Sequence, residues 1–193
     1  MKANRREVLL LPLAGSLLAQ GKLDGTFMAP VKLEVYSDFQ CPGCKQLHET
    51  SLRQLREEFV AKGKVQLVHR EFPLPMHKYA REAACLACAA EKLGKYNVVS
   101  DALFREQDLW SANGRLEDTL AKVLNPADLA KLKALAKDPK TVAEVEADIA
   151  AGKKAELKQT PTMVFSRRGT VQPVSGAVEY GILRRYVEML LAQ

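Results

Sequence analysis

Residues 36–44 read Tyr36-Ser37-Asp38-Phe39-Gln40-Cys41-Pro42-Gly43-Cys44, and this stretch decides the fold of the 193-residue chain. The residues just before it, Val31 to Tyr36, alternate and are rich in β-branched and aromatic side chains, which predicts a strand. Pro42 favours the first position of a helix, where its missing N–H costs nothing. Apolar residues at helical spacing continue this helix to about Ala61. The sequence therefore places two cysteines where a strand gives way to a helix.

The rest of the chain predicts a second strand, a helical block and a closing β-β-α unit. Val65 to Phe72 form the second strand, and a β-α-β unit of this kind normally makes a parallel pair. Helices are expected over residues 79–93, 97–106, 115–124, 126–136 and 139–151. Strands are expected over residues 162–165 and 170–174, and a closing helix over 179–191. The predicted fold class is α/β, in which a helical domain is inserted into a small sandwich.

The Cys41-Pro42-Gly43-Cys44 segment has the residue types and spacing of thiol–disulfide chemistry. Such chemistry needs a thiolate that attacks and a second thiol close enough to resolve the mixed disulfide. With Cys41 at the N-cap, the helix dipole and the free N–H groups of Gly43 and Cys44 stabilise its thiolate. We assign Cys41 as the nucleophile, Cys44 as the more buried resolving thiol, and Pro42 and Gly43 as tuning residues. This strand–helix context is typical of thioredoxin-like proteins.

A second pair, Cys85 and Cys88, lies in a predicted Ala-rich helix. A zinc site made of both pairs is disfavoured, because 40 residues separate them and zinc ribbons use about 15–20. We predict no metal and no cofactor. Cys85 and Cys88 share one helix face, and they are either small buried apolar residues, which we favour, or an accessory disulfide that would strain this geometry.

Thr160-Pro161-Thr162 precedes a predicted strand. Proline cannot occupy a central ladder position, so Pro161 marks the start of the strand. An ordinary trans proline is the commoner state at such a position, whereas a cis bond usually has a structural reason. Both states stay open from the residues alone.

These segments together resemble the DsbA-like thiol:disulfide oxidoreductases of the thioredoxin-fold superfamily. Residues 36–44 are similar to their active-site segment, Glu71-Phe72-Pro73-Leu74 to the end of their second strand, and residues 76–152 to their inserted helical domain. The likeness covers roughly residues 27–192. It implies a thioredoxin-like fold, a Cys41–Cys44 disulfide in the oxidised form, and a cis Thr160–Pro161 bond that faces Cys41 in a substrate groove.

The resemblance also implies a function. The chain would be an enzyme that exchanges or introduces disulfides in exported polypeptides, and a membrane quinone-linked thiol oxidase of the DsbB or vitamin K epoxide reductase type would reoxidise it. A reductase or isomerase would run the same chemistry in the other direction. The alternatives are a non-redox binding module, such as a chaperone or metal carrier, and a glutathione-dependent transferase. The intact cysteine pair argues against the transferase.

Three further residues have open roles. Some relatives carry a buried glutamate beneath the active site, and Glu34 lies in a similar place, although one extra residue separates it from the first cysteine. Glu34 either accepts the Cys44 proton or faces solvent. His48 lies one helical turn after Cys44 and either tunes that thiol or only packs. Gly43 stands where the best-known oxidase has histidine, so we expect a less oxidising potential.

The first 21 residues predict a signal peptide. A basic patch containing Arg5 and Arg6 precedes an apolar run, and small residues follow it near Ala19 to Gly21. An uncleaved anchor and a buried N-terminal helix are the alternatives, and the export route is open. Removing these residues lowers the net charge from +6 to +4. The sequence contains no basic run with interleaved aromatic residues, so it gives no indication of nucleic-acid binding. We therefore expect a periplasmic or extracytoplasmic protein with redox-domain parts at 22–75 and 153–193 around a helical domain at 76–152.

Overall fold

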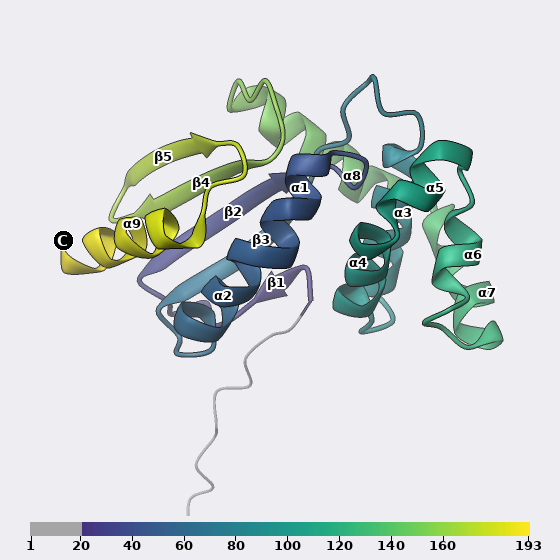
Figure 1. The fold of residues 1–193 in the computed structure, drawn as a ribbon, viewed down its shortest axis with the longest axis horizontal. Helices are drawn as coiled ribbons and strands as arrows, with labels where there is room; N and C mark the ends of the chain where they lie inside the picture. Colours follow the sequence, from purple (N-terminus) through teal and green to yellow (C-terminus); the bar gives the residue numbers. More distant parts are fainter. Residues whose placement is uncertain (1–20) are drawn as a thin grey trace, which may run out of the picture.

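The computed structural model describes residues 21–193, and a five-stranded mixed sheet runs through it (Figure 1). The strand order is β1-β3-β2-β4-β5. The strands are β1 Leu23–Asp24, β2 Val31–Ser37, β3 Val65–Glu71, β4 Thr162–Arg167 and β5 Thr170–Ser175. The central pair, β2 and β3, is parallel, and the other pairs are antiparallel. Because Ser37 lies opposite Glu71, β2 and β3 end at the same edge of the sheet.

A helical segment follows β2, and six helices separate β3 from β4. The first segment comprises α1 Pro42–Leu47, a π-helical turn at His48–Leu52, α2 Arg53–Leu55 and a second π-helical turn at Arg56–Val60. The inserted helices are α3 Ala80–Glu91, α4 Tyr96–Arg105, α5 Gln107–Asn113, α6 Leu116–Leu120, α7 Pro126–Ala136 and α8 Pro139–Lys154. The last helix is α9 Tyr180–Ala192. The helices α7 and α8 each begin with a side-chain cap followed by a proline. The side chain of Asn125 accepts the N–H of Asp128, and that of Asp138 accepts the N–H of Lys140.

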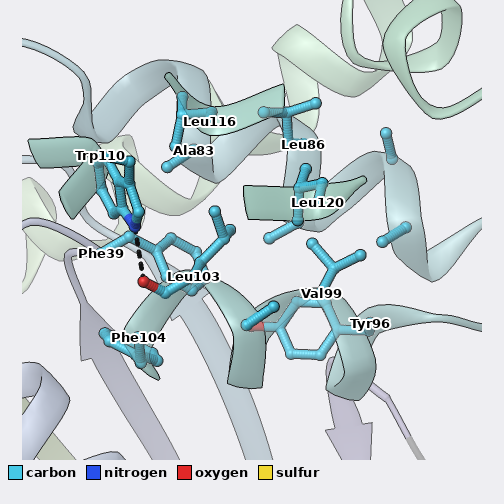
Figure 2. Packing of buried hydrophobic residues seen from close by; sticks show 14 of the residues in the cluster. Phe39, Ala83, Leu86, Tyr96, Val99, Leu103, Phe104, Trp110, Leu116 and Leu120 are labelled. Carbon is cyan, nitrogen blue, oxygen red and sulfur yellow. Dashed lines mark hydrogen bonds between the residues drawn. The ribbon is translucent and has the colours of Figure 1, made fainter. Parts of the chain in front are cut away.

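The core has three parts. Leu33 and Val35 of β2 pack with Leu55 and with Val187 of α9 on one face of the sheet. Tyr36 faces the other side, where it packs with the side chains of α3 and α8. The third cluster lies within the inserted helices, and Figure 2 shows that Phe39 of the loop before α1 belongs to it. The inserted helices are thus packed directly against the segment that carries the first cysteine pair.

The predicted α/β, thioredoxin-like fold with a helical insertion is confirmed, and several details differ. The strand β1 and the helix α5 were not predicted, and the helix expected at 115–124 is only five residues long. The helix expected over 42–61 is continuous but contains the two π-helical turns. The proposed domain boundaries stay predictions, and α8 continues two residues past the boundary at 152.

The predicted signal peptide falls almost entirely in residues 1–20, which lie outside the described part of the chain. Within residues 21–193, no helix is both long enough and apolar enough to cross a bilayer.

Candidate active site

Cys41 lies at the N-cap of α1, at the edge where β2 and β3 end. Its backbone is extended, with φ −79° and ψ 120°, and Pro42 takes the first helical position as the sequence indicates. Its carbonyl accepts the N–H groups of Cys44 at 3.0 Å and Lys45 at 3.2 Å. Cys41 is 9% exposed and Cys44 only 1%. The sulfur of Cys41 is therefore the one that a partner molecule can reach.

The Thr160–Pro161 loop faces Cys41 from the start of β4. The Thr160–Pro161 bond is cis, as the resemblance implies. The Cys41 thiol donates to the Thr160 carbonyl at 3.4 Å. The buried Thr160 hydroxyl makes no hydrogen bond of ordinary geometry within residues 21–193, but it lies near enough to Cys41 to lower the pKa of that thiol. A side chain at Gly43 would bring its Cβ to 3.3 Å from Pro161 Cδ. The glycine therefore lets the cis-proline loop approach the cysteine pair closely.

The two thiols have opposite acidities. The hydrogen bond from Cys44 is the largest influence on Cys41 and, with the Thr160 hydroxyl and the N–H groups of Cys44 and Gly43, lowers the pKa of Cys41 to about 5 against the effect of burial. Burial raises the pKa of Cys44 well above that of a free thiol, and its hydrogen bond to Cys41 adds to the rise. These opposite shifts mean that the accessible sulfur of Cys41 ionises before the inner sulfur of Cys44.

Asp38 ties the loop before Cys41 to the loop after β3. Its buried carboxylate accepts the N–H of Gln40 at 2.7 Å, the N–H of Leu74 at 2.7 Å and the Nδ1 of His77 at 2.7 Å. Its own N–H donates to the Cys44 sulfur at 3.4 Å. Asp38 belongs to the segment from which the site was predicted, but the sequence alone did not indicate its structural role. Its position two residues before Gln40 is the local signal, because aspartate commonly accepts such an N–H in a turn.

Gln107 of the unpredicted helix α5 reaches the same loop from the insertion. Its side-chain amide donates to the carbonyl of Phe39 at 2.6 Å and to that of Cys41 at 3.1 Å. Gln107 is 2% exposed. Nothing in the local sequence marks this residue, because its partners lie more than 60 positions earlier.

Glu34 is not brought to the cysteine pair. Its carboxylate lies 2.6 Å from Arg70 Nη2 and 3.0 Å from Lys32 Nζ, and these partners lower its pKa although burial opposes them. Alternation along β2 places Glu34 with Tyr36 on the sheet face covered by α8, whereas Val35 points to the face that packs against the helical segment after Cys41. The predicted proton-accepting role of Glu34 is therefore not supported by the geometry.

The buried glutamate near this edge of the sheet is Glu71, at the end of β3. It is 2% exposed and accepts a hydrogen bond from the Tyr96 hydroxyl at 3.1 Å. Burial raises its pKa to about 7, and the nearby Lys22 moderates the rise. The quoted Glu71-Phe72-Pro73-Leu74 similarity included this residue, but its burial depends on packing against α4 and could not be read locally.

All four cysteines are free thiols in the described chain, and the Cys41–Cys44 disulfide stays a prediction. Burial raises the pKa of both Cys85 and Cys88. Lys22 Nζ lies 3.3 Å from Cys88 Sγ and 2.5 Å from a carboxylate oxygen of Asp148. The buried, protonated state of the second pair agrees with the favoured interpretation of these cysteines as small core residues.

His48 packs beside the site, and its hydrogen-bond partner in the described chain is Asp101. Its ring stacks on Phe104 at 4.6 Å between centroids, and its Nε2 lies 2.6 Å from an Asp101 carboxylate oxygen. The packing interpretation of His48 therefore fits the structure. Within residues 21–193, no three histidine, cysteine or acidic side chains gather as a metal site would require.

A thiolate at a helix N-terminus, a buried partner thiol and an opposing cis-proline define a thioredoxin-fold protein with a dithiol site. The sequence agrees: a family model described as thioredoxin matches residues 20–175, and the chain belongs to this family. The probable disulfide bond formation protein D of Bacillus anthracis is 32% identical over 96 residues. The match covers 50% of this chain and 42% of that relative, so the chain spans less than half of the relative's length.

Solved structures with the same architecture include several DsbA proteins. Wolbachia pipientis α-DsbA1 is similar with a TM-score of 0.76 and 22% identity, over 95% of this chain and 94% of that one. Pseudomonas aeruginosa DsbA2 has a TM-score of 0.67 and 25% identity, over 90% of this chain and 96% of that one. The chain is thus DsbA-like in fold, including its helical insertion.

Proposed function

We propose that this protein is a thiol–disulfide oxidoreductase that introduces or exchanges disulfides in exported polypeptides through Cys41 and Cys44. The observation that carries the proposal is the difference in acidity between the accessible Cys41 and the buried Cys44. Such a pair combines a good leaving thiolate with a partner thiol that is held in reserve. The Bacillus anthracis relative, named as a probable disulfide bond formation protein, supports the same chemistry.

The reaction begins from the oxidised form. A substrate thiolate attacks Cys41 Sγ, the Cys41–Cys44 bond breaks, and Cys44 leaves and takes up a proton. A second thiolate of the substrate then attacks the substrate sulfur of the mixed disulfide, and Cys41 leaves as the stabilised thiolate. Two electrons pass from the two substrate thiols to the cysteine pair, and a membrane quinone-linked thiol oxidase of the DsbB or vitamin K epoxide reductase type would remove them.

The site residues have distinct proposed roles. Cys41 is the nucleophile and leaving group, Cys44 resolves, and Pro42 and Gly43 set the backbone geometry at the helix start. Thr160 and Pro161 form the wall against which the substrate cysteine approaches. The hydroxyl of Thr160, which is buried and unpartnered in the described chain, is available to the Cys41 thiolate.

The pKa of about 5 for Cys41 indicates an intermediate redox potential. It lies between about 7 for thioredoxin and about 3.5 for a strongly oxidising DsbA, whose potentials are about −270 and −120 mV. We therefore expect a value between these limits, in line with the glycine at position 43. Export through residues 1–21 to a periplasmic or extracytoplasmic compartment would let the protein meet reduced polypeptides and an oxidising partner.

The test is an equilibrium titration of the purified protein with glutathione, combined with oxidation of a reduced two-cysteine peptide. We expect the natural protein to oxidise the peptide and Cys41→Ser to lose this activity, while Cys85→Ser, in the buried second pair, retains it. Full activity in Cys41→Ser would refute the proposal. A potential near that of thioredoxin would instead favour the reductase direction.

A further inference from the structure

A groove with a volume of about 550 Å³ opens at the edge of the sheet that carries Cys41. It is formed by residues 72–78 after β3, Arg81 of α3, the part of α8 from Glu146 to Lys153, and residues 157–158 before the cis-proline. Figure 1 shows that these segments and the start of α1 lie at the same end of the molecule. The groove contains neither cysteine, and none of the site residues discussed above as thiol partners lines it.

The groove has an apolar floor and a basic rim. Phe72, Leu74, Ile149 and Leu157 contribute apolar surface, and the rim carries Lys78, Lys153 and Lys158. The one carboxylate in the lining, that of Glu146, is already paired with Arg81. The three rim lysines form no ion pair within residues 21–193, whereas Glu146 and Arg81 pair with each other, so the lining has a net positive charge. We call this feature the basic groove.

The basic groove is close to the reacting sulfur along two chain segments. Lys158 is two residues before Thr160, so that their Cα atoms are at most about 8 Å apart, and the Thr160 carbonyl is 3.4 Å from Cys41 Sγ. On the other side, the N–H of Leu74 donates to Asp38, whose own N–H reaches Cys44. An extended peptide advances about 3.3 Å per residue. A polypeptide joined to Cys41 would therefore reach the groove about two to four residues from its cysteine.

We propose that the basic groove binds acidic side chains of the substrate polypeptide, about two to four residues from the reacting cysteine. This inference rests on the proposed function and adds a class of substrate to it. The floor accommodates the apolar parts of an extended chain, while the lysines attract carboxylates and steer the encounter. A few side chains fill a pocket of this size.

The experiment compares two reduced two-cysteine peptides that differ only in having two glutamates or two glutamines three residues from the first cysteine. The oxidised protein is mixed with each peptide at low ionic strength, the reaction is stopped with acid, and the rate constant is measured by chromatography. The same is done for dithiothreitol, which is neutral and too small to span the groove. We expect the glutamate peptide to react about tenfold faster than the glutamine peptide, with the ratio falling as salt rises.

Two variants with the same change in net charge locate the effect. The Lys153→Glu/Lys158→Glu variant reverses the charge of the rim, and we expect it to lose the preference for the glutamate peptide when the rate for each peptide is divided by the variant's own rate for dithiothreitol. In the control Lys62→Glu/Lys64→Glu, the exposed lysines precede β3, about 20 Å from its other end, and the preference should remain. Equal rates for the two peptides, or equal losses in both variants, would overturn the inference. Failure of the natural protein to oxidise dithiothreitol would overturn the proposed function itself.

Discussion

Replacing Cys44 with alanine should raise the pKa of Cys41 from about 5 to about 6 or 7. The hydrogen bond from the Cys44 thiol is the largest cause of the low pKa. A hydrogen bond to a charged group contributes about 1.5–3 kcal/mol, and one pKa unit corresponds to about 1.4 kcal/mol. Losing the bond should therefore raise the pKa by about one to two. The N–H groups at the start of α1 and the Thr160 hydroxyl remain and should keep it below the ordinary thiol value of about 8.5.

The ultraviolet absorbance of the thiolate, followed against pH, measures this change directly. The double variant Cys41→Ala/Cys44→Ala serves as the blank, and Cys85 and Cys88 should not titrate in this range because burial raises the pKa of both. The pH dependence of alkylation by a small electrophile gives a second reading of the same pKa. A pKa that stays near 5 would refute the role of Cys44. A pKa near 8.5 would refute the contribution of the helix start.

Three further changes test the surroundings of the site. Burial raises the pKa of Glu71 from 4.5 to about 7, so the folded chain binds this proton more tightly than the unfolded chain and loses stability as the pH rises between these values. Glu71→Gln should remove this pH dependence and raise the free energy of unfolding by up to about 3 kcal/mol at pH 8. Urea unfolding at several pH values measures both effects. Gly152→Ala would place a Cβ 2.5 Å from the Phe72 ring and should cost about 1–3 kcal/mol in thermal unfolding, whereas the control Gly181→Ala meets open space and should not destabilise. Gln107→Leu would leave two carbonyls without their side-chain donor and should cost about 2 kcal/mol by the same measurement.

Local signals predicted the parts of the fold that depend on neighbouring residues. Pro42 marked the start of α1, and the alternation of residues 31–36 marked β2, because both effects act within a few positions. The two-residue strand β1 has no such pattern; it exists because Leu23 pairs with Val68 across the chain. The π-helical turns in the segment after Cys41 likewise had no sequence signal that we identified.

The cysteine pair and the cis-proline loop could be predicted, but their supports could not. Asp38 and Gln107 act through hydrogen bonds to residues far away in sequence, so their roles emerge only once the chain is folded. Glu34 shows the reverse case, since the family resemblance suggested a proton acceptor, but alternation along β2 turns its side chain to the other face of the sheet, where it pairs with Arg70. Separation along the sequence therefore did not predict which side chains contact the site: Gln107, far along the chain, contacts it, whereas Glu34, close to Cys41, does not.

The amide of Gln107 has a consequence for attempts to shorten this protein. A chain that joined β3 directly to β4 would retain the sheet, the Cys41-Pro42-Gly43-Cys44 segment and the cis-proline, which look sufficient for a minimal redox domain. It would also remove the residue that holds the carbonyls of Phe39 and Cys41 and expose the Phe39 ring to water. The insertion therefore supports the loop that carries Cys41, and removing it would make the position of the Cys41 sulfur less fixed in the shortened protein.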